Sequence, residues 1–372
     1  MNSLRSRAPV RALVMTAFAL TMACRAPAGP APIGFAVAGA DPRTHELAQQ
    51  AIDAWHSTRL VEIHRVTRDN TLADLGASVV DAEHLVRVPG LAGVVGHAGS
   101  RGSLMAAPVY AESGVPLVVP TGTSRRLQAL GPLVFPLAPD EEAEGEFIVR
   151  FATDRLAARR VTVVHRYANE YGIGLCDAVI RALARRGLEP ADVIGINPDS
   201  DFTRIVGASM ARATPDAVII AAGPAESRLV IRAFRDRLPA VPVVAGDAVV
   251  LDRAFADSLG TASAPHVYAV AFWHPDSRRE QSRAFVERWM RHPGPPPAGT
   301  DAMYSDGLLL LAEAVRAVGA DRAAVQQYLA ELGRSRPPYE GVTGSISFGP
   351  SRSINLVMTR LDKGSAVTVD FR

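Results

Sequence analysis

Cysteine and lysine are scarce in this chain, and both shortages exclude functions. Only two of its 372 residues are cysteines, Cys24 and Cys176, so we expect no disulfide framework and no Cys-based metal site. Lys363 is the only lysine, which leaves neither a P-loop nor a plausible Schiff-base lysine. The formal net charge is only +2, and the arginines are scattered among acids. We therefore expect no metal, no cofactor and no nucleic-acid partner.

The first residues have the pattern of an export signal. Three arginines precede an apolar run at 12–22, which is too short to span a bilayer. A small residue followed by Cys24 resembles the lipobox of bacterial lipoproteins. Residues 1–31 are therefore predicted to be an export signal and tether, with Cys24 as the lipid-attachment residue and the lipid as the only contact with the membrane. Plain cleavage near Ala23 or Ala28, or retention of the segment, stays open as an alternative.

From residue 32 onward, strand-like and helix-like segments alternate, which is typical of an α/β fold with doubly wound, mainly parallel sheets. The segment 132–140 looks like a crossing, after which the alternation restarts. Strands are expected at 33–38, 61–66, 94–96, 116–119, 161–165, 217–222, 242–245 and 267–272. Helices are expected at 72–86, 142–156, 173–186, 226–238, 278–291 and 302–318.

Two strands in the segment 93–124 run into turns rich in Gly, Ser and Thr, each of which opens a helix. In a parallel sheet such turns lie at the carboxyl ends of the strands, where α/β proteins bind small ligands. The first N–H groups of a helix have no partner within the helix, and the helix dipole is positive there. Ser100 and Thr123 stand at these two turns, so together they predict a cradle for one carboxylate.

Several short motifs in this order carry a resemblance to a known family. They are VVGHAGS, GVPLVVPTGTS, VTVVHRYANEYGIGL, PDAVIIAAG and VPVVAGD, followed by Tyr304, Gly344 and Phe348. The chain resembles the type I periplasmic binding proteins, specifically the branched-chain amino-acid (leucine/isoleucine/valine) binding family of ABC-transporter substrate-binding proteins. The resemblance covers nearly everything from residue 91 to residue 348 and is thin before that.

This resemblance implies two lobes joined by three hinge crossings, which close over a ligand in the cleft. Residues 32–137 and 273–340 would form lobe 1, and residues 138–272 and 341–372 would form lobe 2. The function implied is that of an exported periplasmic or cell-surface receptor, a monomer and not an enzyme. It would bind a small amino acid or related carboxylate and deliver it to an ABC permease. A ligand-sensing binding protein without transport is the alternative.

The resemblance also assigns ligand-binding roles to five residues. Ser100 and Thr123 match the positions that hold the ligand carboxylate, and the carbonyl of Gly122 matches the one that accepts from the ammonium. Tyr171 would cover the ligand backbone from the opposite lobe. Asp247 matches the acidic residue that pairs with the ammonium.

Three departures from the family pattern affect the side-chain pocket. Asp247 is one methylene shorter than the usual acid, Gly223-Pro224 stands where an aromatic often lies, and the loop 39–43 is shortened. Phe272, Trp273 and His274 at the predicted third crossing would compensate by supplying a new wall. Trp273 is therefore included among the ligand-binding residues.

Two enzyme classes are weaker alternatives. Ala98-Gly99-Ser100-Arg101-Gly102 fits a loosened nucleophile elbow, and Asp247 with His266 or His274 would complete a hydrolase triad in the required chain order. No oxyanion-loop motif precedes Ser100, however. The Gly-rich fingerprint of a dinucleotide-dependent dehydrogenase is missing, because the first strand and the turn after it read GFAVAGADPR.

Structural roles are expected for several other polar residues. His97 is expected to be a hydrogen-bonded histidine at a strand end, and Cys176 to be buried apolar filler. Glu141, Glu142, Glu144 and Glu146 are expected to form the solvated first turns of a helix, where acids are favoured by the dipole.

Overall fold

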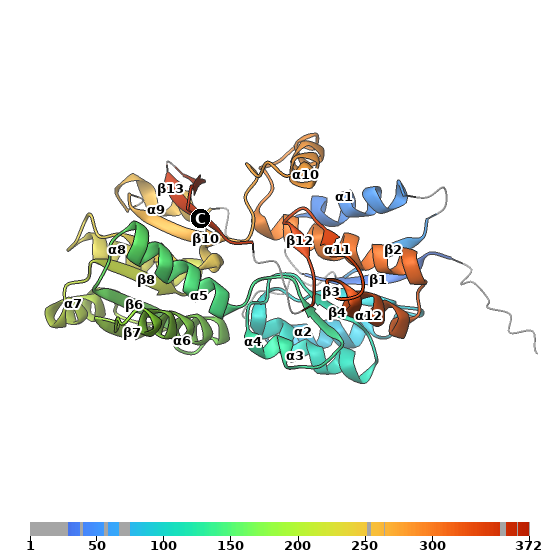
Figure 1. Ribbon diagram of the computed structural model, residues 1–372, viewed down its shortest axis with the longest axis horizontal. Helices are drawn as coiled ribbons and strands as arrows, with labels where there is room; N and C mark the ends of the chain where they lie inside the picture. The colour runs from blue at the N-terminus through green and yellow to red at the C-terminus, as the bar shows by residue number, and fades with distance from the viewer. Residues whose placement is uncertain are drawn as a thin grey trace, which may run out of the picture.

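The computed structural model describes residues 29–37, 40–55, 59–66, 75–250, 254–263, 265–349, 355–362 and 364–371. These residues form two α/β lobes that lie side by side in Figure 1. The predicted export signal with Cys24, and part of the shortened loop 39–43, lie outside the described residues. Among the described helices, none is both long and apolar enough to cross a membrane.

The first lobe is built on a five-stranded parallel sheet with the order β2-β1-β3-β4-β5. Its strands are β1 (Ala31–Ala36), β2 (Val61–Arg65), β3 (Gly93–Gly96), β4 (Leu117–Val119) and β5 (Val134–Pro136). The helices between them are α1 (Pro42–Asp53), α2 (Leu75–Leu85), α3 (Gly99–Glu112) and α4 (Arg125–Gln128). The segment expected only to cross between the units thus contributes β5 before it leaves this lobe.

The second lobe is built on a seven-stranded sheet with the order β14-β13-β10-β9-β8-β6-β7. Its parallel strands are β6 (Val161–Arg166), β7 (Asp192–Ile196), β8 (Ala217–Ala221), β9 (Val243–Ala245) and β10 (Val267–Ala271). Two antiparallel strands, β13 (Val357–Asp362) and β14 (Ser365–Val369), complete one edge. The helices are α5 (Glu141–Arg150), α6 (Glu170–Arg185), α7 (Phe202–Arg212), α8 (Pro224–Arg235) and α9 (Phe255–Ser263).

After β10 the chain returns to the first lobe. It forms α10 (Glu280–Met290), α11 (Gly299–Val318) and α12 (Arg322–Glu331), then the short hairpin β11 (Tyr339–Glu340) and β12 (Ser345–Ile346). α11 packs against α1, α12 and the strands β1 and β3 (Figure 1). The chain therefore passes between the lobes three times: after β5, after β10 and after β12. The predicted residue boundaries of the lobes stay predictions.

Helices cover both faces of each sheet, because successive side chains of a strand point to opposite faces. Val94 and Val95 are both fully buried in β3, yet Val94 joins the core under α2 and α3 while Val95 joins the core under α1 and α11. In β6, Val163 packs toward α5 and α6, and Val164 packs toward α7 and α8. These apolar runs confirm the predicted doubly wound α/β architecture.

Some elements differ from the sequence prediction. The unit of β7 and α7 and the helix α12 were not predicted. The helix predicted at 142–156 is α-helical only over Glu141–Arg150 and continues as a π-helical turn over Phe151–Arg155. Thr153 accounts for part of this change, since its Oγ1 donates to the carbonyl of Val149 at 2.9 Å and competes with the regular backbone bonds.

Candidate ligand-binding site

The two turns predicted to cradle a carboxylate are tied to each other in the first lobe. Ser100 is buried in the first turn of α3, and its Oγ accepts the backbone N–H groups of Thr123 and Ser124 at 3.1 and 3.0 Å. The N–H of Gly99 donates to Thr121 Oγ1 at 3.1 Å. The Ser100 hydroxyl thus accepts both backbone N–H groups of the turn before α4, and it links the end of β3 to the end of β4.

Gly122 is a glycine because its surroundings leave no room for a side chain. A Cβ at this position would lie 2.6 Å from Leu127 Cδ1 and 2.8 Å from Val119 Cγ1. The tight packing holds the peptide that follows, so that Thr123 and Ser124 present their N–H groups to Ser100. The proposed role of the Gly122 carbonyl toward a ligand ammonium stays a prediction.

A carboxyl group of the protein itself occupies the predicted cradle. Thr123 Oγ1 donates to Glu141 Oε1 at 3.3 Å, and the N–H of Arg125 donates to Glu141 Oε2 at 3.2 Å. The carboxyl packs against Gly174 of α6, where a Cβ would lie 2.8 Å from Glu141 Cδ. Burial raises the pKa of Glu141 to about 7, and the charges of Glu170 and Asp140 act in the same direction.

Burial of Glu141 and Glu144 corrects the expectation that all four acids of this helix are solvated. Glu141 is 4% exposed and Glu144 is fully buried. Glu142 and Glu146 are partly exposed and pair with Arg181, Arg185 and Arg186. Positions three apart on a helix share a face, so Glu141 and Glu144 point together into the molecule.

Glu144 and Asp247 form a pair of buried acids on the side of the second lobe. Glu144 Oε1 accepts the N–H of Asp247 at 2.8 Å and the hydroxyl of Tyr171 at 3.5 Å. Burial raises the pKa of Asp247 to about 6 and raises the pKa of Glu144 well above its usual range, with the Asp247 charge adding to the effect on Glu144. Burial likewise raises the pKa of Tyr171, whose hydroxyl is therefore a neutral donor.

Two oxygens of this acidic pair have no hydrogen-bond partner among the described residues. They are Glu144 Oε2 and Asp247 Oδ1, and both are buried. Asp247 itself is 2% exposed. Buried polar atoms without a partner cost free energy, so these two oxygens need an explanation that the fold alone does not supply.

Asp247 also lines a cavity of about 280 Å³ between the two lobes. The second lobe contributes Asp247, the residues after it and parts of α9, β13 and β14, while the first lobe contributes residues 295–299 and Met303. Phe272, Trp273 and His274, predicted to lie at the third crossing, follow β10 at the second crossing and line the cavity there. The lining is mostly apolar, which is typical of small-molecule sites.

Trp273 both packs and lines the cavity. Its Nε1 donates to Ser282 Oγ at 3.0 Å, and its ring meets Phe285 edge-on with centroids 5.8 Å apart. These contacts anchor the indole in the first lobe. Trp273 therefore forms a fixed aromatic wall of the cavity. Its contact with a ligand stays a prediction.

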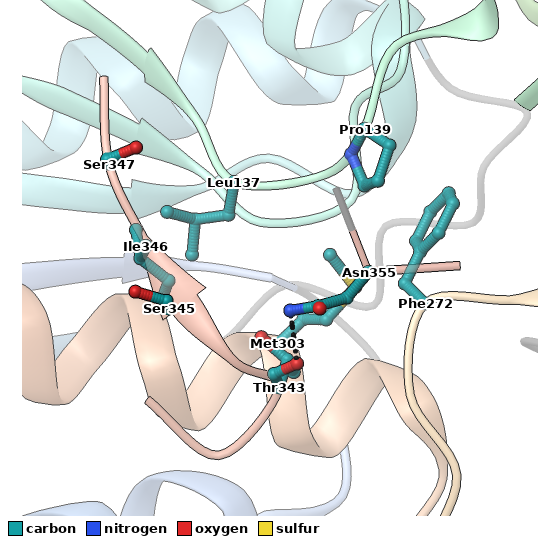
Figure 2. Close-up of a pocket in the computed structure, with 9 residues that line it drawn as sticks. All are labelled: Leu137, Pro139, Phe272, Met303, Thr343, Ser345, Ile346, Ser347 and Asn355. Atoms are coloured by element: carbon teal, nitrogen blue, oxygen red, sulfur yellow. Dashed lines mark hydrogen bonds between the residues drawn. The ribbon is translucent and has the colours of Figure 1, made fainter. Parts of the chain in front are cut away.

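A much smaller cavity, of about 20 Å³, lies where the three crossings meet (Figure 2). Leu137 and Pro139 come from the first crossing, Phe272 from the second, Asn355 from the third, and Thr343 from the turn between β11 and β12. Asn355 Nδ2 donates to the carbonyl of Thr343 at 2.8 Å and ties the last crossing to this turn. A space of this size holds about one water, so we interpret this cavity as part of the hinge.

The geometry opposes the hydrolase alternative. The carbonyl of His266 accepts the N–H of Val243 at the start of β9, whereas Asp247 follows the end of β9, so the two side chains lie at opposite ends of the parallel strands. His274 Nδ1 pairs with Asp276 at 2.7 Å, and its Nε2 contacts the Ala366 carbonyl at 3.0 Å. His274 lines the same cavity as Asp247, but its ring nitrogens are engaged elsewhere, and Ser100 is not among the described residues that line this cavity.

His97 and Cys176 have the structural roles expected of them. His97 is buried at the end of β3, and its Nε2 lies 3.0 Å from the hydroxyl of Tyr110, while burial lowers its pKa to about 4. Cys176 is buried in the core of the second lobe, and burial raises its pKa to about 11. Within the described part of the chain, no group of three or more His, Cys, Asp or Glu residues is arranged to hold a metal.

Two residues that carried the family resemblance, Tyr304 and Phe348, pack behind the strand ends of the first lobe. Tyr304 of α11 packs edge-on against Phe35 with ring centroids 5.9 Å apart. Its hydroxyl also bonds Thr121 in the turn after β4. Phe348, after β12, packs against Phe135 of β5 at 5.0 Å. They hold the strand ends and the hinge in place.

Two α/β lobes, three crossings and a buried acid facing a cavity between the lobes define a two-lobed solute-binding protein. Comparison with known families agrees with this class. The sequence profile of the family described as periplasmic binding protein matches residues 63–356, so the chain belongs to this family. No curated protein matches the sequence significantly.

Solved structures show the same fold. A leucine-binding protein LivK from Thermotoga maritima has a TM-score of 0.80 and 21% identity, covering 91% of this chain and 97% of its own. The branched-chain amino-acid binding protein LivJ of Streptococcus pneumoniae, solved with isoleucine, has a TM-score of 0.79 and 20% identity, with coverages of 91% and 99%. A solute-binding protein of an ABC transporter from R. palustris, solved with benzoate, has a TM-score of 0.75 and 16% identity, with coverages of 92% and 96%.

Sequence reasoning missed Glu141 and Glu144. The signal available was their spacing of three in the first turn of α5, directly after the first crossing. Acids in a first helical turn are normally explained by the helix dipole, and only the contact with Gly174 and Asp247 shows that these two face inward.

Proposed function

We propose that this chain is an exported receptor whose lobes close over a small solute of the amino-acid type and deliver it to an ABC importer. Membership of the family supports the receptor role and the periplasmic location. The similar structures named above are described with leucine, isoleucine or benzoate, which are small solutes with an apolar body. Of the predicted ligand contacts, Asp247 and Trp273 line the cavity, whereas Ser100, Gly122, Thr123 and Tyr171 are not among its described lining residues and stay predictions.

The observation that carries the proposal is Asp247, a buried acid that lines the cavity between the lobes. The Asp247 oxygen without a partner offers a site for an ammonium group, and the apolar lining offers a site for the rest of the solute. Residues from both lobes line the cavity, so a solute held there would stabilise the closed form. A closed receptor is the form that a permease could distinguish from an empty one.

Thermal unfolding of the mature chain, from Ala26 onward, tests the proposal. A panel of amino acids, amides, amines, aliphatic carboxylates and sugars would be added one by one. A ligand at one hundred times its Kd adds about 2.7 kcal/mol to the free energy of unfolding, which moves the midpoint by several degrees. We expect a selective shift with one class of nitrogen-bearing solute, and a shift with sugars alone would contradict the proposal.

Two parts of the proposal concern the membrane: the lipid on Cys24 and delivery of the solute to a permease. We expect Cys24 to carry a lipid, so Cys24→Ser should release the protein from the membrane fraction without changing solute binding. Delivery to a permease predicts that deletion of the chain abolishes uptake of the bound solute. Unchanged uptake together with a lost transcriptional or behavioural response to the solute would favour the sensing alternative.

A further inference from the structure

We infer that the cleft selects a solute that carries an ammonium group on an apolar body and has no free carboxylate, such as an amine or the amide or ester of an amino acid. This inference rests on the proposed receptor function and narrows its substrate class. It follows from three features at and beside the cavity: an occupied cradle, two orphaned carboxyl oxygens and a lining that, among the described residues, is acidic and apolar.

The first feature is the cradle beside Thr123. The groups that would hold a ligand carboxylate already hold Glu141, through the Thr123 hydroxyl and the N–H of Arg125. The Ser100 hydroxyl accepts two backbone N–H groups, so those donors are also engaged. A ligand carboxylate would have to displace Glu141 or lie next to it, and two like charges in a buried site repel each other.

The second feature is the pair Glu144 and Asp247. Each carries one buried oxygen without a partner among the described residues, and each lies against the other rather than against a cation. An ammonium group has three donors and would supply the missing hydrogen bonds and the missing positive charge together. A neutral solute would supply only hydrogen bonds, and an anion would supply neither.

The third feature is the composition of the cavity. Among the described residues that line it, Asp247 and His274 have ionisable side chains, and both ring nitrogens of His274 are engaged by Asp276 and the Ala366 carbonyl. The other walls include Val249, Phe255 and several prolines. The cavity therefore offers one acid for a cation and apolar surface for its body.

Two matched series of ligands test the inference by calorimetry at pH 7. The first contains L-leucine, L-leucine amide, 3-methylbutylamine and 4-methylpentanoate, which share one branched body. The second contains L-phenylalanine, its amide, phenethylamine and 3-phenylpropanoate. In the series that binds, we expect the amide and the amine to bind at least tenfold more tightly than the amino acid, and the carboxylate not to bind.

The outcomes separate this inference from the receptor function. If the free amino acid binds as tightly as its amide, or more tightly, the inference is wrong and the receptor function stands. If no member of either series binds, both are contradicted for this cavity.

Glu141→Gln sharpens the same test. Removal of the charge in the cradle should improve binding of the free amino acid relative to its amide by at least tenfold. Glu142→Gln is the matched control on the same helix, because Glu142 faces Arg181 and Arg185 at the surface, and it should leave the ratio unchanged. An unchanged ratio in folded Glu141→Gln would overturn the role of Glu141, and the wild-type series decides the inference if this variant does not fold.

Discussion

On the first-lobe side of the cleft, the Ser100 and Thr123 hydroxyls both have partners, whereas on the second-lobe side Glu144 and Asp247 each keep a buried oxygen without one. The two sides were predicted to bind the two charged ends of one ligand. The difference in hydrogen-bond partners indicates that the first-lobe side mainly stabilises the fold. The second-lobe side, with its unpaired oxygens, is the side prepared for a ligand.

A comparison of the carboxyl groups leads to the same conclusion. Glu141 accepts hydrogen bonds from the cradle, while burial raises the pKa values of Glu144 and Asp247, and the Asp247 charge raises the pKa of Glu144 further. Groups that destabilise the empty protein are retained in binding sites because the ligand removes their cost. This gives the two sides opposite expected responses to mutation.

The largest expected effect is the loss of ligand binding in Asp247→Asn. Hydrogen bonds to charged groups contribute about 1.5–3 kcal/mol, so the affinity for an amine ligand should fall by roughly tenfold to a hundredfold. Isothermal titration calorimetry with 3-methylbutylamine or phenethylamine, whichever the wild type binds, measures the change. Full affinity in the variant would place the ammonium site elsewhere.

The same substitution should make the empty protein more stable. The folded-state pKa of Asp247 is about 6 and lies above its ordinary value of 3.8, so its contribution to stability is present below pH 3.8 and is lost as the pH rises through 6. Asp247→Asn removes this loss of stability. The free energy of unfolding should therefore rise by up to about 3 kcal/mol at pH 8 and by less at pH 5.

Urea unfolding of both proteins at the two pH values measures this gain. Glu144→Gln should change stability in the same direction, because burial also raises the pKa of Glu144. A variant that is less stable than the wild type at pH 8 would show that the acidic pair stabilises the fold and is not held for a ligand.

On the first-lobe side, Ser100→Ala should destabilise the fold. It leaves the buried N–H groups of Thr123 and Ser124 without their acceptor, which should cost about 2 kcal/mol. Ser365→Ala is the control, since the exposed Ser365 hydroxyl donates only to the carbonyl of Asp362 in its own turn. Urea unfolding would show the difference, and equal stability of the two variants would contradict the structural role of Ser100.

The smallest expected effect concerns the contact between the lobes at Glu170. Ser124 Oγ and Arg126 of the first lobe both bond Glu170 of α6, each at 3.1 Å. The contact is partly exposed, so Glu170→Gln should cost less than about 1 kcal/mol. Small-angle scattering of the empty variant should show a larger radius than the wild type, and an unchanged radius would mean that this contact does not hold the lobes closed.

Much of the fold could be predicted because buried parallel strands leave continuous apolar runs, as at 161–165 and 217–222. β7 was missed because Asp192–Ile196 lies at the sheet edge and alternates in burial, which weakens the signal of a parallel strand. The positions of Ser100 and Asp247 at strand ends could also be predicted from the alternation.

The roles of the polar groups could not be predicted in the same way. Whether the Ser100 hydroxyl faces a ligand or the next turn depends on how closely two strand ends approach each other. Whether Glu141 is solvated depends on a contact with Gly174, 33 residues further along the chain, which no local pattern reveals.

The central claim is that the cleft binds a cation with its own buried acids, and proton release on binding tests it most directly. At pH 6.5, Asp247 and Glu141 have pKa values of about 6 and about 7 and are partly protonated, and the groups around them are Glu144, Tyr171, Glu170 and Asp140. The cation should lower these pKa values and expel protons.

The measurement is calorimetric titration with an alkylamine in buffers of different ionisation enthalpy, since an alkylammonium group, with a pKa near 10, does not titrate at this pH. The account predicts a net release of a sizeable fraction of one proton, which is smaller in Asp247→Asn. Binding with no proton release, or with proton uptake, would contradict it.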